Sequence, residues 1–258
     1  AGLYAGGRTS VTERFKTRDH TERLLKHLGA KITVSGLKTV LKPGPLKAGR
    51  IKVPGDISSA APFIAAACLL QDSKLTIKNT GLNYGRLGFI RTLRAMGAGV
   101  TLDIKTSIPE PAGNIFIRSS ALKGIRINPA QIPALIDEIP LLALAASQAS
   151  GTTVIKGIGE LRFKESDRIK STSALLKALG LKAVLKKDAL IIKGPQKILG
   201  GKPVETFRDH RIAMAGAVAG LLAARAVRIK NSGCVKKSYP GFFHDFKEIF
   251  PRPGKIRF

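Results

Sequence analysis

The sequence predicts an α/β protein built from repeated units. One phrase recurs along the chain: an apolar helix, a strand, a second helix that closes on a Leu-Gly-Ala-like tag, and then further strands. The tags begin at Leu28, Met96 and Leu179. Hydrophobic residues make up 44% of the 258 residues, enough for a buried core, and the aromatic share is 5% without Trp. We therefore expect helices packed against sheets and not an aromatic surface that stacks nucleic-acid bases.

Each unit is expected to open with an apolar helix that leads into a strand. The expected helices are Ser58–Leu70, Asp137–Ser147 and His210–Ala224, and the strands after them are Lys74–Asn79, Thr152–Lys156 and Ala226–Asn231. These Ala-rich helices are apolar on nearly every side, which is typical of helices buried in a bundle and covered by sheets. In each closing tag, Gly supplies the turn that ends the second helix.

A Pro- and Gly-rich segment separates the first tag from the first apolar helix. It covers residues 42–50 and lies between two periodic regions, which is typical of a crossing between domains. We expect a domain boundary near residues 50–55.

The charge balance indicates an anionic partner without naming it. Lys and Arg number 44 against 17 Asp and Glu, a formal net charge of +27. Such a field attracts phosphorylated metabolites, nucleic acid and anionic surfaces alike. The basic residues are spread from Arg8 to Arg257, so a solvated basic surface explains most of them equally well.

Other features favour a cytoplasmic protein without a membrane segment. Cys68 and Cys234 have neither metal-ligand nor redox spacing, which suits a reducing compartment. The apolar stretches are too short to span a bilayer. Because the chain opens at Ala1 without Met, we expect it to be an interior fragment.

Two helix starts carry charged side chains that suit either capping or chemistry. Asp19, with Glu22 three residues later, is a candidate capping box, and Arg18 beside it is placed to meet an anion. Asp137 precedes a helix with Pro140 in its first turn. It either caps that helix or lies on a pocket rim as a proton acceptor.

A third helix start, before the expected helix Ile169–Leu179, is dense in charge. If the helix has already begun, Lys164 and Arg168 lie one turn apart as a repelling pair, and an anion between them would reverse that cost. The alternative is that Glu165 neutralises Arg168 on a solvated face. A helix N-terminus itself favours anionic ligands.

The most apolar helix is also preceded by charges. Asp209 and His210 are typical of a cap and its neighbour, whereas Arg211 beside them suits a clamp for a carboxylate or phosphate. Lys237 follows the last strand, where a surface lysine is the simplest interpretation.

Five phrases in one shared order resemble the EPSP synthase (3-phosphoshikimate 1-carboxyvinyltransferase) family. They are Arg-Asp-His-Thr-Glu at 18–22, Pro-Gly-Asp-Ile-Ser-Ser-Ala-Ala at 54–61, Ile-Asp-Glu-Ile-Pro at 136–140, Lys-Glu-Ser-Asp-Arg at 164–168 and Asp-His-Arg-Ile-Ala-Met at 209–214. The resemblance implies an inside-out α/β barrel of repeated βαβαββ units, with 1–52 ending the first lobe and 53–258 forming the second.

The resemblance also implies a reaction and its residues. The family transfers the enolpyruvyl group of phosphoenolpyruvate to the 5-hydroxyl of shikimate 3-phosphate without a metal or organic cofactor, and we expect a monomer at full length. Asp137 would be the base for the hydroxyl, and Glu165 and Lys237 would move the proton of the methylene carbon. The implied substrate-binding residues are Arg18, Asp137, Lys164, Arg168, His210, Arg211 and Lys237.

Some family features are expected upstream of residue 1, among them the Pro-Gly-Ser-Lys-Ser type phosphoenolpyruvate loop, so we expect the chain alone to be inactive without the amino-terminal part. Two local departures, Pro62 early in its helix and Asn-Tyr-Gly-Arg at 83–86, are expected to be tolerated. Two other functions stay open: enolpyruvyl transfer to UDP-N-acetylglucosamine, and a non-catalytic basic protein that binds nucleic acid through charge.

Overall fold

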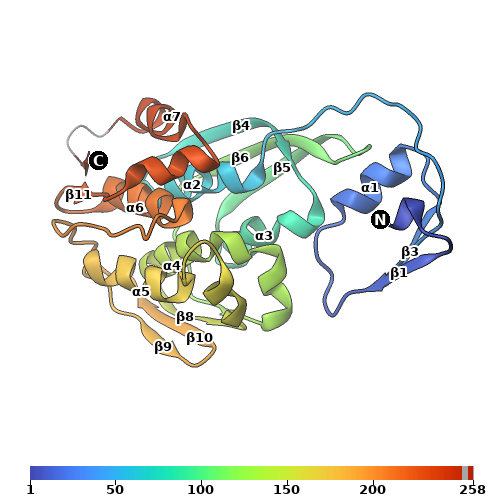
Figure 1. The fold of residues 1–258 in the computed structure, drawn as a ribbon. Helices are drawn as coiled ribbons and strands as arrows, with labels where there is room; N and C mark the ends of the chain where they lie inside the picture. The colour runs from blue at the N-terminus through green and yellow to red at the C-terminus, as the bar shows by residue number, and fades with distance from the viewer. Residues whose placement is uncertain (252–254, 258) are drawn as a thin grey trace.

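The computed structural model describes residues 1–251 and 255–257 and shows two parts of unequal size joined by an extended segment (Figure 1). The smaller part comprises a short 3-10 helix, three strands and one helix: η1 Gly2–Tyr4, β1 Thr9–Thr12, α1 His20–His27, β2 Ile32–Ser35 and β3 Lys38–Leu41. Its strands form an antiparallel sheet in the order β1-β3-β2. No residue between 1 and 56 is buried. This part therefore has no core of its own.

Residues 42–54 cross to the larger part without regular structure. At Gly55 the chain pairs in parallel with Thr80, which anchors it before the first apolar helix. The position of the domain boundary stays a prediction.

The larger part contains three successive units. The first has α2 Ile57–Leu69, β4 Lys74–Gly81, η2 Tyr84–Arg86, α3 Gly88–Ala95, β5 Gly99–Thr106 and β6 Ala112–Arg118. The second has β7 Arg126–Ile127, η3 Pro129–Ala134, η4 Ile136–Glu138, α4 Ile139–Gln148, β8 Gly151–Lys156, η5 Gly159–Phe163, α5 Arg168–Ala178, β9 Val184–Lys186 and β10 Ala189–Gly194. The third has α6 His210–Leu222, β11 Val227–Arg228, η6 Ser232–Lys237, α7 Phe242–Ile249 and β12 Ile256–Arg257.

The first two units share one sheet topology. Their strand orders are β4-β6-β5 and β7-β8-β10-β9, and the strand after the first helix pairs antiparallel with the last strand of its unit. In the third unit β11 pairs in parallel with β12. The repeated α/β architecture expected from the recurring phrase is thereby confirmed.

The helices α2, α4 and α6 form the centre of the molecule and pack against one another. Buried residues make up 11 of 13 positions in α2, 9 of 10 in α4 and 11 of 13 in α6, so these helices are enclosed on all sides. Small Ala side chains allow this close packing, which explains why the sequence shows no single apolar stripe.

The tag glycines end the second helices as predicted. Gly29, Gly97 and Gly180 all have a positive φ, between 79° and 99°. After α1, the amides of Gly29 and Ala30 bond to the carbonyls of Lys26 and Leu25, which satisfies the last turn. A side chain at these positions would be strained.

Most element boundaries expected from the sequence shift by one or two residues, and two differ for physical reasons. The helix expected from Asp137 begins at Ile139, because residues 136–138 form the 3-10 turn η4. The last strand expected, Ala226–Asn231, is reduced to β11, Val227–Arg228, because Asn231 adopts a left-handed conformation and starts η6.

Candidate active site

The N-termini of the three central helices meet, and charged side chains gather there. Ser58 at the start of α2 donates to Glu138 before α4, and Arg211 at the start of α6 donates to the Ser58 backbone oxygen. Because each helix N-terminus carries partial positive charge, their meeting point favours anions. The loop before α1 reaches the same place through Arg18.

Asp137 is the carboxylate in this region that has three cationic side chains as partners. Its oxygens lie 2.6 Å from Arg18 Nη2, 3.1 Å from Arg168 Nη1 and 3.4 Å from Lys164 Nζ. Burial acts to raise the pKa of Asp137, but the Arg18 hydrogen bond and the charges of Lys164 and Arg211 hold that pKa far below its ordinary value. Asp137 is therefore ionised, and it caps neither η4 nor α4 with its side chain.

Arg168 is the buried centre of the charged cluster, with 1% of its side chain exposed. Asp209, which is fully buried, accepts from Arg168 Nε at 2.8 Å, and Glu165 accepts from Nη2. Burial opposes the charge, but the Asp209 hydrogen bond and charge raise the pKa of Arg168 above its ordinary value. Glu165 does pair with Arg168, as one interpretation of the sequence expected. However, Arg168 does not lie on a solvated face, since its side chain is buried against the buried carboxylate of Asp209.

The condition for a repelling Lys164–Arg168 pair, that the helix has already begun at Lys164, is not met. Lys164 lies outside α5, which begins at Arg168 with Asp167 as its cap. Lys164 and Arg168 instead converge on one oxygen of Asp137. The sequence analysis predicted that an anion between Lys164 and Arg168 would offset their repulsion, and in the structure the Asp137 carboxylate lies at that position.

Arg211 and His210 begin α6 behind their cap. Asp209 accepts from the Arg211 backbone N–H at 2.9 Å, so the cap interpretation of Asp209 is confirmed. His210 is mostly buried, with Nδ1 3.9 Å from Asp209, and burial together with the Arg211 charge lowers the pKa of His210. At neutral pH His210 is therefore a neutral neighbour of the cluster.

Lys237 is the one predicted site residue that no described contact joins to this cluster within residues 1–251 and 255–257. It ends η6, is exposed, and its charge acts on the nearby Cys234 thiol. Burial nevertheless raises the pKa of Cys234. Lys237 is thus an exposed lysine at the end of a 3-10 helix, which agrees with the simplest interpretation of the sequence.

The capping box at the start of α1 does not form. Asp19 makes no cap hydrogen bond with its side chain and instead accepts from Arg23 Nε at 3.0 Å and from Asn83 Nδ2 at 2.7 Å. Asn83 also donates to Glu110, which contacts His20 Nδ1 at 2.9 Å. These contacts, like that of Arg18 with Asp137, join the smaller part to the larger one.

Four further residues of the site were not singled out from sequence. Glu138 is 4% exposed, and Ser58 donates to it at 2.5 Å. Arg86 donates to both Asp56 and Ser58, at 2.6 and 2.8 Å. Adjacent acids at 137–138, and Asp56 before an apolar helix, were the only signals, and they indicate capping as readily as a network.

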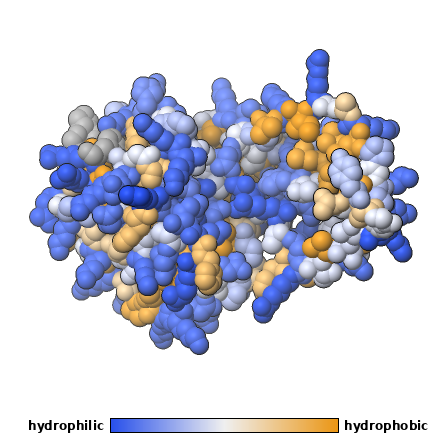
Figure 2. Space-filling model, viewed as in Figure 1, coloured by the Kyte–Doolittle hydropathy of each residue, from blue (hydrophilic) through white to orange (hydrophobic). Residues whose placement is uncertain are grey.

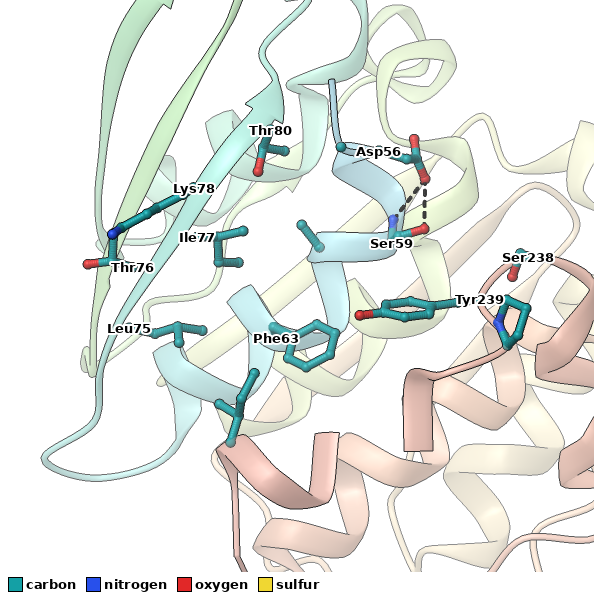
Figure 3. Close-up of a pocket in the computed structure, with 14 residues that line it drawn as sticks. Asp56, Ser59, Phe63, Leu75, Thr76, Ile77, Lys78, Thr80, Ser238 and Tyr239 are labelled. Carbon is teal, nitrogen blue, oxygen red and sulfur yellow. Dashed lines mark hydrogen bonds between the residues drawn. The ribbon is translucent and has the colours of Figure 1, made fainter. Parts of the chain in front are cut away.

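An apolar cavity of about 580 Å³ lies beside the site, between α2, β4 and the segment before α7 (Figure 3). Phe63, Ile77 and Tyr239 line it, and at its polar end Asp56 accepts from the backbone and side chain of Ser59. Asp137 is not among its lining residues. Because the charged cluster combines three helix N-termini with cationic side chains that suit an anionic ligand, we place the candidate site there and not at this cavity.

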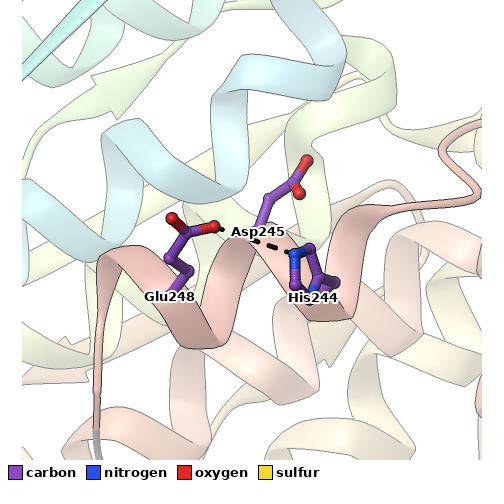
Figure 4. Close-up of side chains that lie close together, drawn as sticks. All are labelled: His244, Asp245 and Glu248. Carbon is purple, nitrogen blue, oxygen red and sulfur yellow. Dashed lines mark ion pairs between the residues drawn. The ribbon is translucent and has the colours of Figure 1, made fainter.

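One group of side chains of metal-ligand type lies on α7 (Figure 4). His244 Nε2 is 3.8 Å from Glu248, both are exposed, and Asp245 accepts a hydrogen bond from Tyr239 at 2.6 Å. Burial and Asp245 together raise the pKa of Tyr239 to about 12, so that hydrogen bond persists at neutral pH. Asp245 is thus already engaged, and we assign no metal to the group.

Among the described residues, no helix is both long and apolar enough to cross a bilayer.

Solved structures with a similar fold are enolpyruvyl transferases. An EPSP synthase from Acinetobacter baumannii superimposes with a TM-score of 0.86 at 37% identity, covering 96% of this chain and 57% of that one. The enolpyruvyl transferase NikO from Streptomyces tendae gives 0.75 at 22% identity, covering 96% and 56%, which supports the fold alone. The fold is thus that of the enolpyruvyl transferases, as the sequence resemblance implied.

Sequence comparison narrows this class. The family model for EPSP synthase (3-phosphoshikimate 1-carboxyvinyltransferase) matches residues 1–246. The 3-phosphoshikimate 1-carboxyvinyltransferases of Petrotoga mobilis and Desulforudis audaxviator are 46% and 47% identical, and the match covers 96% of this chain in each case. The chain belongs to the EPSP synthase family. It spans 58% of the length of these two relatives.

Proposed function

We propose that this chain provides one wall of a site at which the enolpyruvyl group of phosphoenolpyruvate is transferred to the 5-hydroxyl of shikimate 3-phosphate. The observation that carries the proposal is Asp137, a carboxylate contacted by Arg18, Lys164 and Arg168 where two parts of the chain meet. The amino-terminal part found in longer relatives would supply the opposite wall. No metal or organic cofactor is part of the proposal.

The cations suit two multiply charged substrates. Phosphoenolpyruvate and shikimate 3-phosphate each carry a phosphate and a carboxylate, so bringing them together requires positive charge to offset their repulsion. In the proposal Lys164 binds shikimate 3-phosphate, while Arg168, Arg211 and Lys237 bind the phosphate and carboxylate of phosphoenolpyruvate. His210 packs behind that clamp, and Arg18 approaches both substrates from the other part.

Asp137 becomes a competent base when substrates displace its partners. Its pKa is held low by Arg18 and Lys164. When those cations turn toward substrate phosphates, the pKa of Asp137 rises, and the carboxylate accepts the 5-hydroxyl proton. Substrate binding thus activates the base.

The reaction then proceeds by addition and elimination. The 5-oxygen bonds to C2 of phosphoenolpyruvate while C3 takes up a proton, giving a tetrahedral intermediate with a methyl group. Loss of a proton from C3 and cleavage of the C2–O bond to phosphate restore the double bond and release phosphate. In the proposal Glu165, with 43% of its side chain exposed, moves the C3 proton, and Lys237 is a second candidate.

Phosphate release tests this function. The chain is assayed with both substrates, alone and mixed with a separately produced amino-terminal half of a relative. We expect release only in the mixture and its loss in Asp137→Ala. If the mixture releases no phosphate while circular dichroism shows a folded chain, the family membership describes ancestry and not activity.

The alternative acceptor is tested in the same mixture. We expect no phosphate release when UDP-N-acetylglucosamine replaces shikimate 3-phosphate. If phosphate were released from phosphoenolpyruvate with UDP-N-acetylglucosamine but not with shikimate 3-phosphate, the acceptor would be reassigned. Retention of duplex DNA by the chain at moderate salt would instead favour the basic-protein function.

A further inference from the structure

Arg211 is held by one hydrogen-bond acceptor and one ion-pair partner. Its Nη1 lies 2.9 Å from the backbone oxygen of Ser58 and 3.9 Å from Glu138 Oε1. Its Nε is buried without a hydrogen-bond partner in the described part of the chain. One end of the guanidinium is therefore fixed by other helices, while the Nε–H remains without an acceptor among the described residues.

The Ser58 oxygen is available because of Pro62. In an α-helix the oxygen of Ser58 would accept from the N–H four residues later, but that residue is Pro62, which has none. Pro62 lies in the second turn of α2 and not in the permitted first turn, so the tolerance expected from sequence has another cause. Arg211 supplies the missing donor, which leaves this buried carbonyl satisfied.

Glu138 is the second group that contacts the Arg211 guanidinium, beside the Ser58 carbonyl. The Ser58 hydroxyl accepts from Arg86 at 2.8 Å and donates to Glu138 at 2.5 Å, so its orientation is determined. Burial raises the pKa of Glu138, although the Arg211 charge and the Ser58 hydrogen bond oppose it. A carboxylate with 4% exposure is costly to keep charged, and the charge of Arg211 does most to offset that cost.

We propose that Pro62 and Glu138 are positioning residues: they form, with the Ser58 carbonyl, a socket that fixes the Arg211 guanidinium for an anionic substrate. Neither residue needs to touch the substrate. The Arg211 charge acts on Asp137, Asp56 and Glu138 alike, which places the socket beside the charged cluster. The part of the proposal that concerns substrate rests on the proposed function.

Side-chain NMR of arginine in the 258-residue chain tests the socket without requiring activity. The Arg211 signals are assigned by their loss in Arg211→Lys. We expect hindered rotation and separate Nη signals in the wild-type chain, and averaged signals in Pro62→Ala, whose new N–H competes for the Ser58 oxygen, and in Glu138→Gln. Arg168 signals are the internal reference, and Glu160→Gln, at an exposed position of η5, is the matched control.

Stability measurements separate positioning from general loosening. Pro62→Ala restores a helix hydrogen bond, so its unfolding temperature should not fall. Because the folded-state pKa of Glu138 is raised, the wild-type chain loses stability as pH rises from the ordinary glutamate pKa through the raised one. Glu138→Gln removes that loss. The unfolding free energy of the variant minus that of wild type should therefore be more positive at pH 8 than at pH 4.

Kinetics in the reconstituted mixture complete the test. We expect the KM for phosphoenolpyruvate to rise on the order of tenfold in either variant, with kcat changed far less and the KM for shikimate 3-phosphate unchanged. If wild-type mixtures are inactive, the proposed function fails while the Arg211 spectrum still decides the socket. Unchanged Arg211 signals in both variants would overturn the socket, and an unchanged KM despite averaged signals would overturn its role toward substrate.

Discussion

The two parts of the chain are held together in different ways. The larger part is organised around α2, α4 and α6, which are almost entirely buried. The smaller part has no buried residue, and apolar side chains gather on its surface (Figure 2). Within it Tyr4 is 94% exposed and Val11 60% exposed. Within this chain, hydrophobic burial stabilises the larger part but contributes little to the smaller one.

The difference explains where the site lies. The smaller part contacts the larger one through polar pairs: Arg18 with Asp137, His20 with Glu110, and Asn83 with Asp19. Polar contacts respond to bound anions and salt, whereas a buried core does not. The boundary between the parts is therefore the place where we expect a bound anion to change the structure most.

The largest effect is expected inside the charged cluster. Arg168→Met leaves Asp209 charged, buried and without its main partner, which should cost about 3–5 kcal/mol of unfolding free energy. Urea unfolding measures it. Adding Asp209→Asn removes the buried charge but keeps an acceptor for the α6 cap, so the double variant should recover most of the loss. A double variant no more stable than Arg168→Met would show that charge is not the cause.

Matched leucines compare the two parts directly. Leu144→Ala in α4, at a site with 0% exposure, should cost about 2–5 kcal/mol. Leu25→Ala in α1, where no residue is buried, should cost about 1 kcal/mol or less. Unfolding by denaturant gives both values, and equal losses would mean that the smaller part has a core of comparable importance.

The Asp137 cluster should make stability depend on acid pH. Because the folded-state pKa of Asp137 is lowered, the stability it contributes is present above the ordinary aspartate pKa and is lost as pH falls through the lowered value. Asp137→Asn should therefore lower the unfolding free energy by about 2 kcal/mol at pH 7 and by progressively less below pH of roughly 4. A deficit that does not change with pH would contradict the assigned pairing.

A similarly small effect is expected at the polar contacts near α1. Asn83→Ala removes donors to Asp19 and Glu110, which should cost about 1 kcal/mol. Faster proteolysis within residues 42–54 measures the loosened crossing. A cleavage rate equal to wild type would show that Asn83 does not hold the parts together.

The sequence was sufficient for features that depend on local pattern. Apolar runs predicted the three central helices, and the tag glycines predicted the turns that end α1, α3 and α5. Patterning did not predict β12, because this strand depends on pairing between distant residues. Nor did it predict the shortening of the expected Ala226–Asn231 strand, because the left-handed conformation of Asn231 leaves no mark in the apolar pattern.

Some members of the charged cluster were singled out from sequence, but their connections were not. Asp137, Lys164 and Arg168 were singled out because they are charged residues near helix starts, and they do converge. The sequence does not show that Arg168 donates to Asp209, which lies 41 residues away. Pro62 is the clearest case. It was interpreted as a tolerated local departure, whereas it leaves the Ser58 carbonyl free to accept a hydrogen bond from Arg211 on another helix.

Hydrogen exchange of the full chain tests the contrast between the parts most directly. We predict that amides of β1–β3 exchange faster than those of α4, and that Asp137→Asn speeds exchange in the smaller part while α4 keeps its protection. Exchange of both parts at one common rate, unaltered by Asp137→Asn, would contradict the account, because the smaller part would then be held by something other than its polar contacts with the larger one.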